Sequence, residues 1–558
     1  MAEAIRVVES PSLKSVETDR PIETKTQAHP PKRSPASLAR VLRPGAMLRQ
    51  TARFGTELAK IAVGTSEVKA HPKDKRFEDP AWRENIVYRR TLQTYLAWVD
   101  AVHGSVSESP EAWRDVEEIH HALEILTSAA APTNTFLGNP AAIKEAFDTG
   151  GASILRGAKH MLSDLWNNRG MPLQVDRSEF EVGKDVALTP GAVIFRNEVL
   201  EVIQYTPTTH KVHSRPTLMI PPQINKYYFM DLAPGRSFVE HALSQGLQVL
   251  MVSWRNPTRA QRDWNLDTYV GALLEAIDAA CEVTGSDKLN LVSFCAGGIT
   301  ATALLSHMAK IGDDRVASIA YGVTMLDWYE RAPLGRLQRP GAIAISRALT
   351  QLLGVFPGEQ LDGVFSWARP NDLVWRYWVN NYLMGKTPPG FDILAWNNDS
   401  TNLPAGLHEQ FVEVFFENAM CDGQLEVMGE PVDLKAIEVD NFVTGAITDH
   451  LTPWKGCYRT TQLLSGDSTF VLSNAGHIAS LVNPPGNPKA SYRLGPEPGP
   501  DPEQWLAEST QSSGTWWTVW VDWVRERSGE EKQVSGELGS ALHPALEPAP
   551  GRYVRQGV

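Results

Sequence analysis

Residues 288–308 read KLNLVSFCAGGITATALLSHM, which is an apolar strand followed at once by a helix. The apolar run stops at Cys295, and the helical pattern opens with the small residues AGG. A cysteine at such a turn has the setting of a nucleophile elbow, where a strained turn lifts a side chain above the edge of a sheet. The usual pattern has Gly two residues before the nucleophile, whereas this chain has Ser293. Cys295 is therefore a candidate nucleophile, and the alternative is a small buried packing residue.

Short apolar runs surround this segment and alternate with amphipathic stretches, which is typical of a largely parallel sheet flanked by helices. The runs are TLMI (217–220), QVLMVSW (248–254), LNLVSF (289–294), VASIAYGVTML (316–326), NFVTGAI (441–447) and TFVLSN (469–474). The stretch TYVGALLEAIDAACEVTG predicts a helix that ends at Gly285. Together with the elbow, this order predicts an α/β-hydrolase fold.

The remaining chain suggests three further parts. Residues 1–37 are rich in Pro, Ser, Thr and charge without an apolar period, so we expect them to be disordered. Residues 38–184 carry helical patterns and predict a mainly helical N-terminal domain. The catalytic domain then spans 185–558, and the aromatic-rich interval 327–440 breaks the strand–helix alternation, as an inserted cap subdomain would.

An acid and a base follow Cys295 in the order that α/β-hydrolases require. Asp449 comes just after the run 441–447, and His477 comes just after the next run. His450 is a competing base, but it precedes the last predicted strand, whereas the fold places its base after that strand. We therefore favour Cys295, Asp449 and His477 as the catalytic residues. The other three cysteines lack an elbow context and are expected to be packing residues.

The helix after Cys295 bears on its reactivity, because a helix N-terminus stabilises a thiolate and makes it a better nucleophile at neutral pH. An oxyanion hole takes one backbone N–H from the residue after the nucleophile, here Ala296, and one from the loop after an early strand. That loop reads PPQINKYYFMDL (221–232), so its donor is Ile224 or Gln223. We take Ile224 as the working choice; an ordinary turn is the alternative.

Composition excludes several classes of function. The formal net charge of −12 argues against nonspecific nucleic-acid binding, which relies on positive charge. Four cysteines without a CxxC pair do not suit a disulfide framework or a thiolate zinc site, so no metal site is expected, and a reducing cytoplasm fits. We find no secretory signal pattern and no apolar run long enough to span a membrane.

Taken together, these motifs resemble those of the polyhydroxyalkanoate synthases. The matching stretches are PPQINKYYFMDLAPGRSFVEHALSQG, VSWRNP, VSFCAGG, YWVNNYLMG, WNNDSTNLP, ITDHLTPW, SNAGHIASLVNPPGNPKA and EPAPGRYV, with a further likeness in 75–100. The resemblance implies an acyltransferase that polymerises 3-hydroxyacyl-coenzyme A into polyester through a Cys295 acyl-enzyme, with coenzyme A as leaving group and no cofactor. The family's Cys, Asp and His fall on Cys295, Asp449 and His477, and its usual Gly falls on Ser293.

The same resemblance carries expectations about assembly and location. It implies a single-subunit synthase, closest in its N-terminal region to those of medium-chain monomers, whose cap takes part in homodimer contacts. The expected place is the cytoplasm, at the surface of polymer granules and beside granule-associated proteins. Two other functions stay open: a thiol hydrolase on the same fold, and a noncatalytic granule-surface protein. Preferred monomer length, oligomeric state and the exact role of Asp449 are not decided by the sequence.

Overall fold

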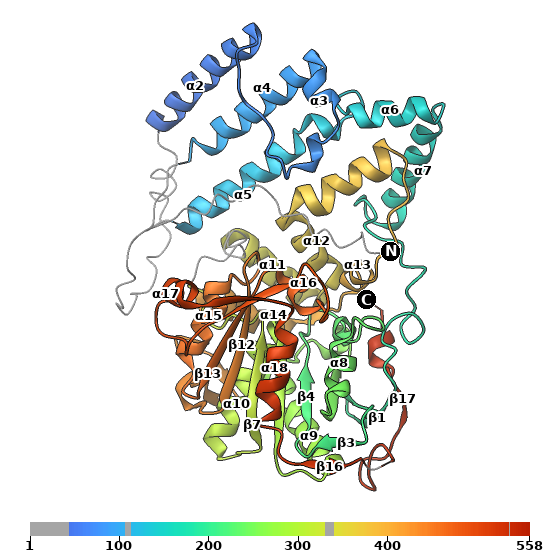
Figure 1. Ribbon diagram of the computed structural model, residues 1–558, viewed down its shortest axis with the longest axis vertical. Coiled ribbons are helices and arrows are strands. Elements are labelled where there is room, and N and C mark those ends of the chain that lie inside the picture. The colour runs from blue at the N-terminus through green and yellow to red at the C-terminus, as the bar shows by residue number, and fades with distance from the viewer. Residues whose placement is uncertain (1–43, 107–112, 330–339, 535, 558) are drawn as a thin grey trace. The chain divides into compact units, whose positions relative to one another are not determined.

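The computed structural model describes residues 44–106, 113–329, 340–534 and 536–557 (Figure 1). The segment expected to be disordered, 1–37, lies outside these ranges. The chain divides into two compact units. Of the described residues, the helical unit comprises 44–106, 113–176 and 363–390, and the sheet unit comprises 177–329, 340–362, 391–534 and 536–557. The interval 327–440 thus contributes to both units, while the domain boundaries given above remain predictions.

The helical unit confirms the helical character of the N-terminal region. Its helices are α2 (Pro44–Val63), α3 (Ala81–Glu84), α4 (Ile86–His103), α5 (Trp113–Ala129), α6 (Pro140–Asp148) and α7 (Ala152–Asn167). Asn85 begins α4 by accepting hydrogen bonds from the N–H groups of Val87 and Tyr88, which would otherwise lack partners. Phe77, Trp82, Leu92, Tyr95 and Ala131 form a buried cluster between these elements.

Residues 363–390 complete this unit from a distant part of the chain. They include two π-helical segments, η7 (Asn371–Trp375) and η8 (Trp378–Leu383). The hydroxyl of Tyr382 donates to Asp164 Oδ2 at 2.8 Å, and Trp378 Nε1 donates to the Asn134 carbonyl at 3.1 Å. A Cβ on Gly157 of α7 would lie 2.0 Å from the Tyr382 carbonyl oxygen, so only glycine permits this approach.

The sheet unit has the α/β-hydrolase architecture that the sequence predicted. Among the described residues, eleven strands form one sheet in the order β15-β14-β13-β12-β7-β6-β4-β5-β2-β1-β17. The six central strands are parallel: β4 (Thr217–Ile220), β5 (Val249–Trp254), β6 (Leu289–Phe294), β7 (Val316–Gly322), β12 (Asp440–Ala446) and β13 (Ser468–Ser473). All residues of β4, β5 and β6 are buried, which is why these strands appear in the sequence as continuous apolar runs.

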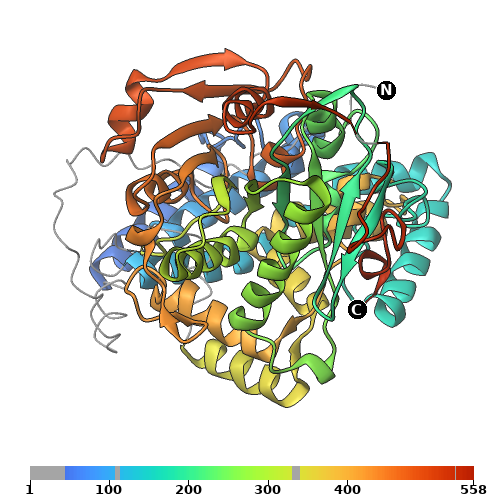
Figure 2. The ribbon, with the colours of Figure 1, turned by 90° about the horizontal axis from the view of Figure 1, so that it is seen from below.

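Antiparallel strands extend the sheet at both edges. They are β1 (Gly191–Arg196), β2 (Leu200–Tyr205), β14 (Ser491–Leu494), β15 (Thr510–Ser513) and β17 (Glu547–Pro548). Figure 2 shows the orange-red strands β14 and β15 running beside one another at one edge. The short pairs β3 (Lys211–His213) with β16 (Glu531–Gln533), β8 (Val355–Phe356) with β9 (Leu403–Pro404), and β10 (Glu426–Val427) with β11 (Glu430–Pro431) stand apart from this sheet.

Five helices in the described chain pack on the sheet: α8 (Phe238–Ser244), α9 (Leu266–Thr284), α10 (Ala296–Ile311), α15 (Trp454–Leu463) and α18 (Trp516–Arg525). The other helices along this part of the chain are α11 (Pro340–Leu353), α12 (Gly358–Ala368), α13 (Asp392–Asn397), α14 (Ala405–Val412), α16 (His477–Leu481) and α17 (Pro502–Glu508). Helix α9 ends at Gly285 with φ 61°, the left-handed conformation that favours glycine. Within the described ranges, no helix is long and apolar enough to cross a membrane.

Candidate active site

Cys295 occupies a strained turn between β6 and α10. Its φ of 49° and ψ of −123° lie in a region that residues with a side chain rarely adopt, so neighbouring contacts must hold the turn. The Cys295 N–H donates to the Gly322 carbonyl of β7 at 3.0 Å, and Thr324 Oγ1 donates to the Cys295 carbonyl at 3.3 Å. This is the geometry of a nucleophile elbow at the carboxyl edge of the parallel strands.

The small residues around Cys295 allow close contacts between the elbow and its surroundings. A Cβ on Gly297 would lie 2.7 Å from the carbonyl oxygens of Ile220 and Pro221, and one on Gly298 would lie 2.3 Å from Thr324 Oγ1. Ser293, where the elbow pattern has Gly, is fully buried, and its hydroxyl donates to the Ala320 carbonyl at 3.3 Å. The serine therefore has room and a hydrogen-bond partner within the sheet.

Asp449 and His477 meet at the same edge of the sheet, on the loops after β12 and β13. Asp449 Oδ2 lies 2.7 Å from His477 Nδ1. Asp449 Oδ1 accepts the N–H groups of Leu451 at 2.8 Å and Thr452 at 3.0 Å. The acid is thus held by the loop that follows it, and its side chain has no exposed area.

Thr452 is a further polar residue of this site that sequence reasoning did not identify. Its Oγ1 lies 2.9 Å from Asp449 Oδ2, 2.9 Å from the Val323 carbonyl oxygen and 3.1 Å from His477 Nδ1. The signal was present in the sequence, because a polar residue three positions after an Asp often closes a turn around its carboxylate. Thr452 thus contacts both side chains of the Asp449–His477 pair.

The charges of these three side chains are coupled. Burial by itself lowers the pKa of His477, but the Asp449 carboxylate, the Cys295 thiolate and hydrogen bonds to both outweigh it and raise the pKa to about 10. For Asp449, burial favours the neutral acid, yet the His477 charge and its hydrogen bond hold the pKa below the usual range. His450 adds to that effect through its charge. His477 therefore holds its proton more tightly than a free histidine does.

The other three thiols lie in different environments. Burial raises the pKa of Cys281 to about 11 and the pKa of Cys421 above its ordinary value. Burial also raises the pKa of Cys457, and the nearby charges of Asp449 and Cys295 act in the same direction. These thiols therefore stay protonated at neutral pH, which disfavours them as nucleophiles.

The two expected oxyanion donors lie on adjoining elements. Ala296 is the first residue of α10, and Ile224 lies on the loop after β4. Gln223 Nε2 donates to Thr300 Oγ1 of α10 at 2.8 Å, which anchors this loop to the helix that starts at the elbow. The choice between Ile224 and Gln223 as backbone donor stays a prediction.

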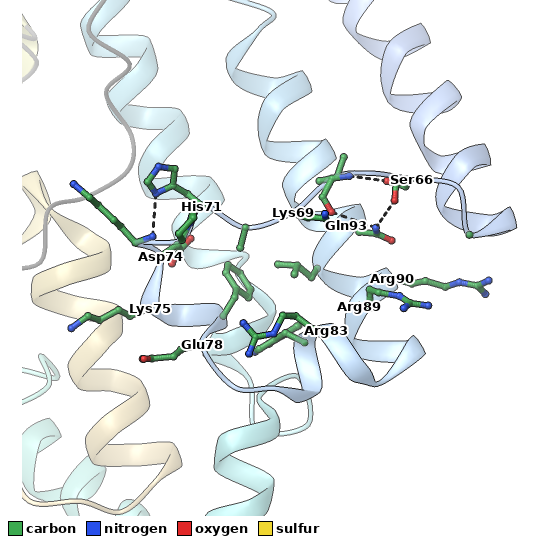
Figure 3. Close-up of a pocket in the computed structure, with 18 residues that line it drawn as sticks. Ser66, Lys69, His71, Asp74, Lys75, Glu78, Arg83, Arg89, Arg90 and Gln93 are labelled. Atoms are coloured by element: carbon green, nitrogen blue, oxygen red, sulfur yellow. Dashed lines mark hydrogen bonds between the residues drawn. The ribbon is translucent and has the colours of Figure 1, made fainter.

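A separate cavity of about 1230 Å³ lies in the helical unit (Figure 3). Basic side chains are prominent in its lining: Lys69, His71, Lys73, Lys75, Arg83, Arg89 and Arg90. None of the candidate catalytic residues lines it. In the part of the chain that the structure describes, no group of three or more His, Cys, Asp or Glu side chains is arranged to hold a metal ion.

Comparison with known proteins adds independent information. Residues 73–242 match the model of the poly-beta-hydroxybutyrate polymerase (PhaC) N-terminus, and residues 216–484 match the alpha/beta hydrolase fold. The chain is 47% identical over 503 residues to poly(3-hydroxyalkanoate) polymerase 2 of Ectopseudomonas oleovorans, covering 90% of each chain. It is 38% identical over 503 residues to the poly(3-hydroxyalkanoate) polymerase subunit PhaC of Cupriavidus necator, covering 89% of this chain and 85% of that one. Among solved structures, a monoacylglycerol lipase of Paleococcus ferrophilus is similar with 14% identity and a TM-score of 0.31, covering 57% of this chain and 97% of the lipase.

Proposed function

The chain belongs to the poly(3-hydroxyalkanoate) polymerases, enzymes that join hydroxyalkanoate units into polyester, and on that premise we propose that it works through a Cys295 acyl-enzyme served by His477 and Asp449. The observation that carries the proposal is the strained Cys295 turn beside a buried, hydrogen-bonded Asp449–His477 pair. Its substrate is a 3-hydroxyacyl-coenzyme A thioester, and no cofactor takes part.

In the first half-reaction the Cys295 thiolate attacks the thioester carbonyl. The carbon–sulfur bond to coenzyme A breaks, and the departing thiolate takes the proton held by His477, so coenzyme A leaves as a thiol. The Ala296 and Ile224 N–H groups stabilise the oxyanion that forms on the way. Because one thioester replaces another, the step is nearly thermoneutral and suits repeated transfer.

In the second half-reaction a hydroxyl attacks the Cys295 acyl group. His477 accepts the hydroxyl proton, an ester bond forms, and Cys295 leaves as a thiolate. A hydroxyl is a far weaker acid than a thiol, so this step depends more on a correctly oriented base. Water must also be kept from the acyl-enzyme, since hydrolysis would compete with every elongation step.

Asp449 acts in this scheme as the residue that orients His477. Its carboxylate has no exposed area and already accepts from the backbone of the following loop and from His477. A group so placed can hold the imidazole tautomer with Nδ1 protonated, and it has no free surface for an incoming hydroxyl. We therefore assign the contact with the hydroxyl to His477 alone.

We also propose medium-chain monomers, a homodimer, and attachment to the surface of polymer granules in the cytoplasm beside granule-associated proteins. The monomer class is suggested by the family resemblance of the N-terminal region. Attachment is supported by an apolar face on α7, where Leu155 is 75% exposed, Leu162 55% and Trp166 87%. Such a face needs an apolar partner, and the polyester that the enzyme makes is one.

The test of the function combines two readouts with purified protein. Short-chain and medium-chain 3-hydroxyacyl-coenzyme A are supplied separately, and coenzyme A release is followed together with turbidity from polymer. Release with rising turbidity, faster for medium-chain substrate, is expected. Release of soluble hydroxy acid without turbidity would favour the thiol hydrolase. No release from any substrate would favour a noncatalytic granule protein.

A further inference from the structure

The loop after β4 is held by its carbonyl groups. The Pro221 carbonyl accepts from Trp254 Nε1 at 2.8 Å, and the Lys226 carbonyl accepts from Trp396 Nε1 at 2.7 Å. Between these ends, Thr401 makes two contacts: its hydroxyl donates to the Gln223 carbonyl, and its N–H donates to the Ile224 carbonyl at 3.3 Å. Four carbonyls between 221 and 226 are therefore fixed.

The hydroxyl of Thr401 has a particular consequence for Ile224. The Gln223 carbonyl and the Ile224 N–H belong to one planar trans peptide, so they point in opposite directions. Holding the carbonyl oxygen thus sets the direction of the N–H. The Ile224 N–H itself donates to no residue in the described part of the chain, which leaves it available to an oxyanion.

Thr401 is itself held firmly. It is 2% exposed and lies between α13 and β9, within the interval inserted between β7 and β12. The preceding Ser400 pairs with Asn225 as an isolated bridge, and its hydroxyl donates to Asp362 Oδ2 at 2.8 Å.

Asn402 fixes the other side of Thr401. Its N–H donates to Asn256 Oδ1 at 2.9 Å, and its Nδ2 donates to the Pro257 carbonyl at 3.0 Å. With both flanking residues anchored, the Thr401 hydroxyl has a fixed position relative to the loop.

We propose that Thr401 is a positioning residue for the oxyanion hole, directing the Ile224 N–H through the Gln223 carbonyl. The inference rests on the proposed Cys295 mechanism and adds to it a residue from outside the α/β core. A side chain of the same shape without the hydroxyl should therefore slow transition-state formation without weakening substrate binding.

The experiment compares Thr401→Val with Thr401→Ser. Valine keeps the shape and the backbone N–H to Ile224 but removes the hydroxyl, whereas serine keeps the hydroxyl. We expect kcat for coenzyme A release to fall about 10- to 100-fold in Thr401→Val, somewhat less than for the loss of an oxyanion donor itself, with KM unchanged. Thr401→Ser should restore most of kcat. Thermal unfolding is measured for each variant, and Thr401→Ala supplies the same comparison if the valine variant does not fold.

Thr284→Val is the matched control. Thr284 is also a buried threonine whose hydroxyl donates to a carbonyl, that of Ala280 at 2.7 Å, but it ends α9 just before β6 begins, at the sheet edge opposite Cys295. Its kcat should stay near that of the unchanged protein.

Two results would overturn the inference: kcat of the hydroxyl-free variant within twofold of the unchanged protein, or Thr401→Ser as slow as the hydroxyl-free variant. Failure of the proposed function is distinguishable, because it would appear as coenzyme A release by Cys295→Ala whatever residue stands at 401.

Discussion

Replacing Asp449 by Asn should separate the two half-reactions. The amide oxygen can keep the N–H groups of Leu451 and Thr452, but an NH₂ group then faces His477 Nδ1 in place of the carboxylate oxygen 2.7 Å away. The imidazole then takes the tautomer whose Nε2 carries the proton, and it cannot accept one from a hydroxyl. We expect a first burst of coenzyme A release near one equivalent, followed by very slow turnover.

The magnitudes follow from what each half-reaction loses. Acylation by a thiol loses mainly the charge-assisted hydrogen bond to His477, about 1.5–3 kcal/mol, so the burst should slow about 10- to 100-fold. Attack by a hydroxyl also needs the lost base, and a wrong tautomer in a catalytic triad lowers kcat about 10⁴-fold. Sustained turnover should therefore fall about 10³- to 10⁴-fold.

Rapid mixing with 3-hydroxyacyl-coenzyme A measures the burst, and intact-mass detection looks for an acyl group on Cys295. Asp440→Asn is the control, because Asp440 begins the same strand that ends just before Asp449 and lies at the far edge of the sheet. Its burst and turnover should both persist. An Asp449→Asn variant without a burst would show that Asp449 is needed to activate the thiol. The idea that Asp449 serves mainly the attack by the hydroxyl would then be wrong.

Three further predictions concern the same residues. Cys295→Ala should release no coenzyme A, whereas Cys281→Ala should stay active. Release of coenzyme A by Cys295→Ala would mean that another thiol is the nucleophile. His477→Gln should prevent acylation near neutral pH, and His450→Gln should cost much less, so the reverse order in a coenzyme A assay would exchange their roles. The pKa of His477, about 10, lies above its unfolded value, so its protonated form contributes stability that is fully present below about pH 6.5 and lost as pH rises toward 10. Urea unfolding should show this loss in the unchanged protein and not in His477→Gln; equal pH profiles would contradict the coupling.

Much of the fold was predictable because its central strands are buried on both faces. The runs at 217–220 and 289–294 coincide with β4 and β6 residue for residue. The edge strands β14 and β15 escaped prediction, because each has four residues that are at least partly exposed; β15 is TQSS and joins the sheet by pairing with β14. Such segments carry no apolar period, so their pairing depends on neighbours that the local sequence does not reveal.

The candidate site likewise has parts that the sequence predicts and parts that it does not. The positions of Cys295, Asp449 and His477 along the chain could be predicted, because the fold dictates that each follows a strand. The contact between Thr401 and Gln223 joins residues 178 positions apart, so no local sequence pattern predicts it. The interval 327–440 was expected to form an inserted cap subdomain, and the aromatic pattern that marks it does not indicate which compact unit each part joins.

The contribution of 363–390 to the helical unit has a consequence for how the chain is made. The segment before Asp176 cannot complete its packing until 363–390 has been synthesised. The reason is that Gly157 packs against the backbone of Tyr382, and Asp164 accepts a hydrogen bond from the Tyr382 hydroxyl. At about 5–20 residues per second, the ribosome takes roughly 10 to 40 seconds to bridge that interval. During this time the N-terminal helices lack the segment 363–390 that completes their packing. Meanwhile the ribosome synthesises the sheet strands that precede residue 390. The N-terminal helices come first in the sequence but complete their packing only after 363–390 has been synthesised, so removing them would leave 363–390 without the surface it packs on.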